Sequence, residues 1–249
     1  MSEQEKYSRR DFLKKSGYAA GGVVGGGLIA SLITMQVMED DPKTKNSQTN
    51  GGSEDQFNDA FMFFTNRDDF RVLASSCERI FPEDENGPGA IKLGVPFFID
   101  HQLAGPWGNN TKEYMQGPFY KGEPTQGYQS RMNRGEIFRV GIKKLKEKAQ
   151  SDYEKSFQEL SAEEQDKILT AFENDDVKIS GTTSAEFFEM MRAATIEGVY
   201  ADPMYSGNRN MEGWKMKQFP GAQMSYIGKI ESDKFVDIEP QSLHSMLNK

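Results

Sequence analysis

The densest group of chemically capable side chains lies between positions 197 and 214. Glycines and prolines fix turns along this stretch, so several hydrogen-bonding groups follow one another over a short backbone path. These groups are Glu197, Asp202, Tyr205, Asn208 and Arg209. Two carboxylates can act as general acid and general base when their surroundings separate their pKa values. One hypothesis is therefore an autonomous enzyme that uses two of Glu197, Asp202 and Glu212.

Two other interpretations of the special residues are open. The loop that contains Asp202 and Arg209 can hold itself rigid and present a flat polar surface to a partner protein. Alternatively, the aromatic segment from Trp107 to Tyr128 can form part of a tethered ligand-binding module. Of the three, we favour the structural loop that also forms an interface, because little else in the chain supports chemistry of its own.

Composition limits the cofactors that this chain could hold by itself. The chain has one cysteine, Cys77, and two histidines, His101 and His244. These counts exclude a cysteine-rich metal or iron–sulfur site and give little support to a histidine-based zinc or haem site. The chain also lacks a Gly-x-Gly-x-x-Gly motif after a strand and a Cys-x-x-Cys-His motif. We therefore expect no cofactor in this chain, so any redox centre must belong to a partner.

Charge argues against a polyanionic partner. The net charge is -8 and the isoelectric point is near 5.0, whereas nucleic-acid binding needs clustered Lys and Arg side chains that displace counterions. The richest basic run, residues 143–148, alternates with apolar residues at helical spacing, which is typical of a solvated helix face. We expect no nucleic-acid partner.

Helical periodicity and capping signals indicate the elements that must position these residues. They predict five main helices: one between Thr65 and Pro82, one from Val95 to Gly105, one over residues 133–150, one opening at Ser161 and one opening at Thr183. Cys77 falls on the apolar face of the first helix, which indicates a buried small side chain. The sequence thus predicts an all-α fold, a single compact helical domain over residues 57–249 with long ordered loops.

One of these loops separates the second and third helices. Residues 107–131 are rich in Gly, Pro, Tyr, Asn and Gln and show no helical periodicity. We expect the loop to be ordered, because its aromatic side chains carry too much apolar surface to leave in water. These side chains are Trp107, Tyr114, Phe119, Tyr120 and Tyr128.

The N-terminus carries an address motif. The run Ser8-Arg9-Arg10-Asp11-Phe12-Leu13-Lys14 precedes an uncharged stretch, residues 16–38, that its glycines make weakly hydrophobic. This arrangement resembles the twin-arginine export signal, whose pattern is filled here by Arg9, Arg10, Phe12 and Leu13. Residues 1–38 are thus predicted to be a twin-arginine signal or an uncleaved membrane anchor, and the polar residues 39–56 a flexible linker. Because that route exports folded proteins, we expect the chain at the extracytoplasmic face of the cytoplasmic membrane.

A longer pattern covers most of the folded region. It includes Glu197-Gly198, Asp202-Pro203-x-Tyr205-x-Gly207-Asn208-Arg209, Gly213-Trp214-Lys215 and Phe219-Pro220-Gly221, with support from Ile80-Phe81-Pro82 and Gly94-Val95-Pro96-Phe97-Phe98-Ile99-Asp100. With a twin-arginine signal in front, this pattern resembles the gluconate 2-dehydrogenase subunit 3 family, the small or gamma subunit of membrane-associated flavin dehydrogenases.

The resemblance implies a non-catalytic accessory subunit that supports the export, stability and anchoring of a large FAD-containing sugar or sugar-acid dehydrogenase. It places FAD in that partner, and it implies that a cytochrome c subunit with haem c often passes electrons onward. The large subunit, the twin-arginine translocase and the membrane are therefore the expected partners. No catalytic residue carries over from the family.

The expected contact with the flavoprotein follows from the two special loops. Aromatic and arginine side chains carry much of the binding energy where water is excluded. We therefore predict that the contact includes Trp107, Tyr120, Asp202, Tyr205, Asn208, Arg209 and Trp214.

Overall fold

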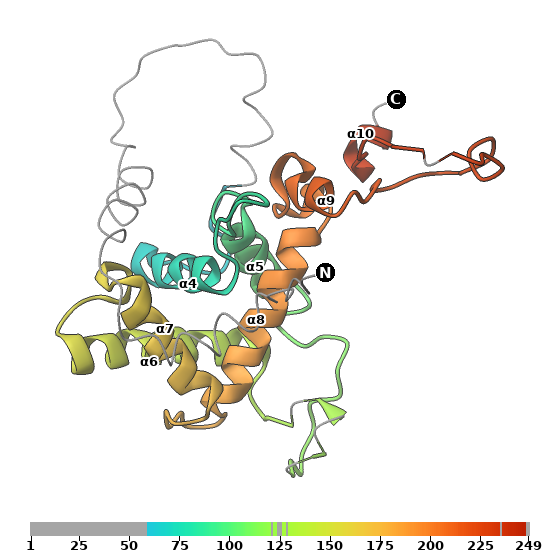
Figure 1. Ribbon diagram of the computed structural model, residues 1–249. Helices are drawn as coiled ribbons and strands as arrows, with labels where there is room; N and C mark the ends of the chain where they lie inside the picture. The colour runs from blue at the N-terminus through green and yellow to red at the C-terminus, as the bar shows by residue number, and fades with distance from the viewer. Residues whose placement is uncertain (1–58, 121, 124–125, 128, 235, 248–249) are drawn as a thin grey trace, which may run out of the picture.

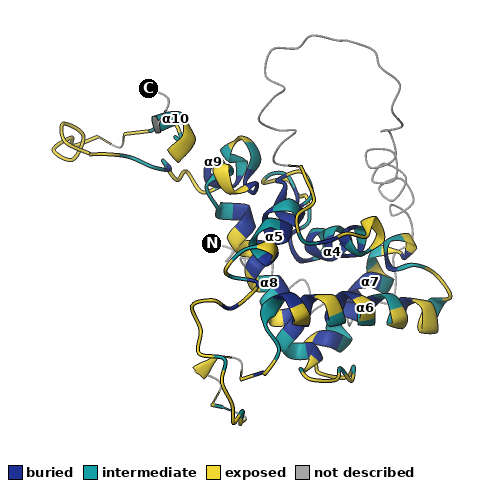
Figure 2. Cartoon of the chain, turned by 180° about the vertical axis from the view of Figure 1, so that it is seen from behind, coloured by how far each residue is buried: buried dark blue, intermediate teal, exposed yellow. Residues whose placement is uncertain are grey.

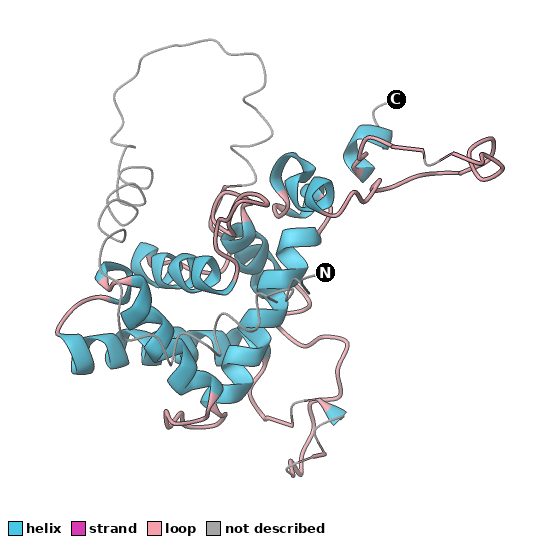
Figure 3. Cartoon of the chain, viewed as in Figure 1, coloured by secondary structure: helices cyan, strands magenta, loops and turns pink. Residues whose placement is uncertain are grey.

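The computed structural model describes residues 59–120, 122–123, 126–127, 129–234 and 236–247, which form helices joined by loops (Figure 1, Figure 3). No β-strand occurs within these ranges. The fold is built from five long α-helices: α4 (Arg67–Ile80), α5 (Val95–Ala104), α6 (Arg134–Tyr153), α7 (Ala162–Glu173) and α8 (Ser184–Tyr200). Two short helices near the C-terminus follow, α9 (Glu212–Met216) and α10 (Leu243–Leu247). The prediction of an all-α fold with five main helices is confirmed.

Local sequence signals set the starts of the long helices. Three of them begin with a capping box, in which a side-chain oxygen and a carboxylate three residues later satisfy each other's backbone donors. These pairs are Asn133 with Glu136, Ser161 with Glu164, and Thr183 with Glu186. Helix α4 differs slightly from the prediction, because its N-cap is Asn66 rather than Thr65. The Asn66 side chain accepts a hydrogen bond from the backbone N–H of Asp68 at 2.8 Å.

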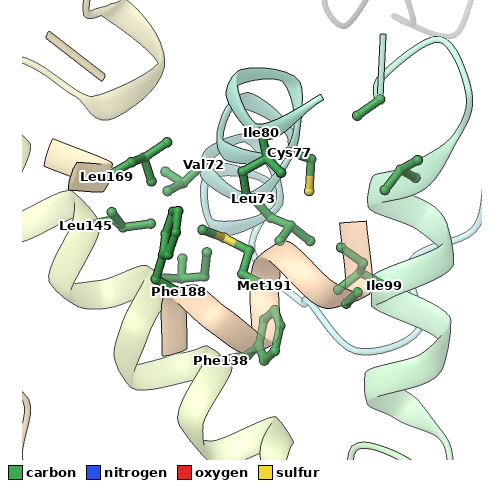
Figure 4. Packing of buried hydrophobic residues seen from close by; sticks show 14 of the residues in the cluster. Val72, Leu73, Cys77, Ile80, Ile99, Phe138, Leu145, Leu169, Phe188 and Met191 are labelled. Carbon is green, nitrogen blue, oxygen red and sulfur yellow. The ribbon is translucent and has the colours of Figure 1, made fainter. Parts of the chain in front are cut away.

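Helix α8 lies at the centre of the fold and contacts α4, α5, α6 and α7. Its Phe187 side chain is fully buried and meets two other rings edge-on, Phe138 of α6 at 5.5 Å and Phe172 of α7 at 5.9 Å between centroids. Figure 4 shows the neighbouring layer, in which Met191 and Phe188 lie among apolar side chains of α4, α6 and α7. Because aromatic burial and edge-to-face contacts are both favourable, this cluster holds α4, α6 and α7 on α8.

A buried ion pair joins α4 to α7. The Arg79 guanidinium donates two hydrogen bonds to the Asp166 carboxylate, at 2.8 and 2.9 Å, in a bidentate arrangement. The Asp166 side chain is 8% exposed and the Arg79 side chain 17%. The pair therefore fixes the relative position of two helices in a partly water-excluded setting.

The loop that follows α4 is held by a partly buried carboxylate. Glu78 accepts hydrogen bonds from the backbone N–H groups of Ile91, at 2.9 Å, and Glu83, at 3.3 Å. Burial raises the pKa of this carboxyl group, because desolvation disfavours its charged form. Glu78 thus ties the end of α4 to the residues that lead into α5.

The aromatic loop between α5 and α6 is anchored near both ends. Trp107 packs edge-on against Phe138 at 6.0 Å between centroids, and the Arg134 guanidinium lies 5.1 Å from the Trp107 ring centroid. At the other end, Ser130 donates a hydrogen bond to the carbonyl of Gly181 at 3.0 Å.

The expectation that the aromatic side chains of this loop are covered is wrong for two of them. Tyr114 is 82% exposed and Tyr120 is 75% exposed. The loop reaches away from α8 between its anchors, so that the body of the domain does not cover these rings (Figure 1). Tyr128 lies outside the described residues.

The predicted N-terminal segments, residues 1–38 and 39–56, also lie outside the described residues, as do Arg9, Arg10, Phe12 and Leu13. Among the helices that the structure describes, none combines the length and the apolar character needed to cross a bilayer.

Candidate functional site

The segment that links α8 to α9 folds as a series of tight turns. It contains two 3₁₀ turns, η4 (Pro203–Tyr205) and η5 (Arg209–Met211). Four of its non-glycine residues have positive φ angles: Ser206 (74°), Asn208 (47°), Asn210 (54°) and Met211 (58°). This conformation is uncommon for residues with a side chain and persists where surrounding contacts impose it. This segment, α9 and the turn after α9, residues 201–221, are here named the motif loop, and specific contacts hold its first part in shape.

Asn208 is the central clamp of the motif loop. Its side chain is fully buried, donates a hydrogen bond to the carbonyl of Ala201 at 2.8 Å and accepts one from the N–H of Gly213 at 2.7 Å. The amide therefore ties the end of α8 to the start of α9. Gly213 allows this approach, because a Cβ atom there would collide with the Val199 carbonyl and the Asn208 side chain.

Trp214 also belongs to the interior. Its side chain is 5% exposed, and its indole N–H donates a hydrogen bond to the carbonyl of Tyr200 at 2.8 Å. The Trp214 ring meets Phe219 edge-on at 5.4 Å between centroids. Asn208 and Trp214 are therefore buried and shape the loop from inside, and their contact with a partner stays a prediction.

Arg209 connects the motif loop to two distant segments. Its backbone N–H donates to the carbonyl of Leu93 at 3.1 Å, and its guanidinium pairs with Asp59 and lies 5.4 Å from the Phe97 ring centroid. The Arg209 side chain is 32% exposed. It is therefore partly accessible to a partner, although it is already engaged.

His101 lies beside this junction. One ring nitrogen, Nδ1, is 2.9 Å from the Ser206 hydroxyl, and the other, Nε2, is 2.8 Å from the carbonyl of Ala60. Both nitrogens of the imidazole thus have protein partners. His101 therefore links α5 to the motif loop and to residue 60.

Asp100 fixes the segment that enters the domain before α4. Its carboxylate is fully buried and accepts hydrogen bonds from three successive backbone N–H groups: Met62 at 2.6 Å, Phe63 at 3.2 Å and Phe64 at 2.8 Å. Three donors aimed at one carboxylate offset the cost of burying its charge. Asp100, His101 and Arg209 together dock residues 59–64 on α5 and the motif loop.

Asp202 and Tyr205 lie on the outer side of the motif loop. One oxygen of Asp202 caps η4 by accepting from the N–H of Met204 at 3.1 Å, and the other accepts from the N–H of Leu243 in α10 at 2.8 Å. Asp202 therefore holds the C-terminal helix against the motif loop. Tyr205 is 48% exposed and Met204 42%, so η4 presents apolar surface to solvent.

The three carboxylates considered for catalysis serve separate purposes. Glu197 is exposed on α8, Asp202 is a cap, and Glu212 pairs with Lys215 at 2.7 Å. Within the described residues, no hydrogen bond joins any two of the three. The arrangement gives no support to an acid–base pair.

The other titratable side chains of the described residues also give no support to a catalytic site. In the described part of the chain, no group of three or more His, Cys, Asp and Glu side chains is placed to hold a metal ion. Cys77 is fully buried on α4, where desolvation raises the pKa of its thiol to about 12. A thiol in that setting stays protonated and unreactive at neutral pH. The prediction of a buried structural cysteine is confirmed.

Comparison with known proteins identifies the family. The family model described as gluconate 2-dehydrogenase subunit 3 matches residues 67–221, more than half of the chain. The chain belongs to this family. No curated protein and no solved structure matches it significantly. The gluconate 2-dehydrogenase subunit 3 match begins at the start of α4 and ends at the last residue of the motif loop, so it contains the five long helices and every clamp described above except residues 59–64 and 243.

Part of this site was not predictable from sequence. The gluconate 2-dehydrogenase subunit 3 pattern indicated Asp202, Asn208, Arg209 and Trp214, which the structure does bring together in the motif loop. It gave no signal for Asp59, whose partner Arg209 is 150 positions away. Trp107 and Tyr120 lie in a different loop, between α5 and α6.

Proposed function

We propose that this chain is a non-catalytic accessory subunit of a membrane-associated, FAD-dependent gluconate dehydrogenase or related sugar or polyol dehydrogenase. The observation that carries the proposal is the family match over residues 67–221, the residues that form the helical core and the motif loop. The side chains support it, because two of the three candidate catalytic carboxylates are already engaged, Asp202 in a cap and Glu212 in an ion pair. In this proposal the FAD lies in the large partner subunit, and haem c lies in a cytochrome c subunit where one is present.

The proposed contact with the flavoprotein uses the exposed side of the motif loop. Tyr205, Met204 and Phe219 are 48%, 42% and 48% exposed, and they surround a loop that Asn208 and Trp214 hold rigid from inside. A rigid surface loses less conformational entropy on binding than a mobile loop does, so the rigid motif loop is suited to an interface. Asp202 and Arg209 add polar groups at the edge, and Trp107 and Tyr120 extend the proposed contact to the aromatic loop.

We further propose that the N-terminal twin-arginine segment brings the folded complex across the cytoplasmic membrane and keeps it at the extracytoplasmic face. Support comes from the complete Arg9-Arg10-x-Phe12-Leu13 pattern ahead of an uncharged stretch. A flavoprotein subunit without its own signal would then leave the cytoplasm bound to this chain.

Affinity purification of the full chain from detergent-solubilised native membranes tests the proposal. We expect a large second chain with a flavin absorbance spectrum to co-purify, and we expect the preparation to oxidise gluconate or a related substrate with an artificial electron acceptor. The control is the full chain expressed without its neighbours, which should show neither flavin nor turnover. Turnover by that control, or purification without any flavoprotein, would contradict the proposal.

A further inference from the structure

Beyond the motif loop the chain makes a long excursion and then returns to α10. Residues 222–240, here named the C-terminal arm, project away from the helical body (Figure 1). The base of the arm is closed where the N–H of Ala222 donates to the carbonyl of Gln241 at 2.8 Å, and the N–H of Gln241 donates to the carbonyl of Pro220 at 3.2 Å. The arm therefore leaves and re-enters the body at one point, beside the motif loop.

The tip of the arm is a single hydrogen-bonded turn. The N–H groups of Lys229 and Ile230 both donate to the carbonyl of Tyr226, at 2.9 and 3.1 Å. This turn displays apolar side chains to solvent: Ile227 is 91% exposed, Ile230 is 80% exposed, and Met224 just before the turn is 89% exposed. Tyr226 is 44% exposed.

The arm is more exposed than the helices of the domain. Every residue from 224 to 234 is exposed (Figure 2), whereas the helices behind the arm each bury one face. Solvated loops are normally polar, and a contiguous cluster of exposed large apolar side chains marks an interaction site. The family match ends at residue 221, so the arm lies outside the matched region and the family description does not account for it.

Charge indicates what the arm binds. Residues 222–240 contain two lysines, Lys229 and Lys234, and four carboxylates, Glu231, Asp233, Asp237 and Glu239, which gives a net charge of +2 - 4 = -2. The whole chain carries -8. A second copy of this chain or an anionic membrane surface would therefore bring like charges together. A protein groove with an apolar floor and a cationic rim would complement the arm.

The place of the arm indicates which protein that is. Leu243, 41% exposed, follows the arm directly and is hydrogen-bonded to Asp202, so it lies near the exposed Met204 and Tyr205 of η4. The arm therefore starts from the same side of the molecule as the proposed interface of the motif loop.

We propose that the C-terminal arm docks its apolar tip, Tyr226, Ile227 and Ile230, into an apolar, cationic-rimmed groove of the large flavoprotein subunit. This inference rests on the proposed function. It adds a second anchoring point, because a projecting turn with apolar side chains three positions apart matches the way single helical turns enter grooves. The motif loop provides a rigid surface on the body, and the arm adds a contact that lies away from the body.

Two variants with the same charge change test the inference in the assembled complex. Ile227→Asp with Ile230→Asp adds two negative charges and removes the apolar tip. Lys229→Asp also makes the turn more negative by two charges, but it keeps both isoleucines. Each full chain is co-expressed with the flavin-containing large subunit that co-purifies with the wild-type chain, and the dissociation constant of the complex is measured together with the melting temperature of each chain alone.

We expect the double isoleucine variant to weaken assembly at least about 30-fold, the effect of losing an interface hot spot. Lys229→Asp should bind within about threefold of wild type, since a cationic rim tolerates added negative charge. Neither change should lower the melting temperature, because both isoleucines are exposed. Unchanged affinity of the double variant overturns the inference alone, and so does a wild-type chain that forms dimers through the tip. Absence of any flavoprotein with the wild-type chain overturns the proposed function and, with it, the assigned occupant.

Discussion

At the level of single residues, Asn208 and Trp214 illustrate why a motif can be located in a sequence without its role being fixed. Polar and aromatic side chains serve interfaces and loop interiors equally well. Their direction depends on the left-handed backbone at Asn208 and on the proximity of Ala201 and Tyr200. These are properties of the folded loop, so sequence spacing alone could not assign them.

Truncation of Trp214 and of Tyr205 should therefore have different consequences. We expect Trp214→Ala to destabilise the chain by about 3–5 kcal/mol, as large aromatic deletions in packed interiors do. Tyr205→Ala should change the stability by about 0.5 kcal/mol or less, because this ring is 48% exposed, and should instead weaken binding of the flavoprotein. Differential scanning calorimetry and affinity measurements on both variants check this. Equal melting temperatures for the two variants would show that Trp214 is not a core residue.

Glu78 should make stability depend on pH. Its pKa is raised by burial from an ordinary value of 4.5, so the folded chain binds this proton more tightly than the unfolded chain does. The contribution of Glu78 to stability therefore falls as pH rises from 4.5 through its folded pKa, and it is constant above that value.

The comparison with Glu78→Gln isolates this effect. The unfolding free energy of the wild type minus that of the variant should decrease as pH rises across this window, measured by urea denaturation. A difference that increased with pH would show that the hydrogen bonds from Ile91 and Glu83 outweigh desolvation.

At the level of elements, the long helices were predictable because their signals are local. The boxes at Ser161 and Thr183 and the apolar periodicity of α4 require only neighbours in sequence. The short helices α9 and α10 were not predicted, since helices of five residues are unstable by themselves and form through tertiary contacts such as those of Asn208 and Asp202. The exposure of the C-terminal arm was also not predicted, because apolar residues in a sequence suggest burial and only tertiary structure shows otherwise.

The ion pair between α4 and α7 gives a prediction at this level. Asp166→Ala should destabilise the chain by about 3–5 kcal/mol, because it leaves the Arg79 charge largely buried without its partner. The double variant Arg79→Met with Asp166→Leu should recover most of this loss, since apolar residues of similar volume replace such pairs well. Chemical denaturation of the three chains measures both effects. A double variant as unstable as Asp166→Ala would indicate that the pair orders the helices in a way that packing cannot.

At the level of the whole molecule, the N-terminal arginine pair should decide where the complex goes. We expect Arg9→Lys with Arg10→Lys to leave this chain and the proposed flavoprotein partner in the cytoplasm, because an ammonium does not reproduce the planar guanidinium. Lys6→Ala, which removes a cation outside the pair, is the matched control and should be exported normally. Cell fractionation with antibodies to both chains provides the readout. Export of the flavoprotein in the arginine variant would show that it does not travel with this chain.

The contacts that unite the molecule were the least predictable from sequence. Asp59, Ala60 and residues 62–64 meet Asp100, His101 and Arg209 across separations of 36 to 150 positions. In the sequence, each residue of such a contact can be recognised only as a polar residue, because its partner cannot be identified. The number of possible long-range residue pairs grows with chain length, and the packing of the helices determines which of these pairs form.

The docking of residues 59–64 has a mechanical consequence. A load applied to the chain from its N-terminal side enters the domain at Asp59 and meets, in order, the Arg209 pair, the His101 contact at Ala60 and the three bonds to Asp100. These contacts would break one after another, before tension reached the first turn of α4. Pulling force would thus be dissipated at the edge of the fold while the aromatic core around α8 stayed closed.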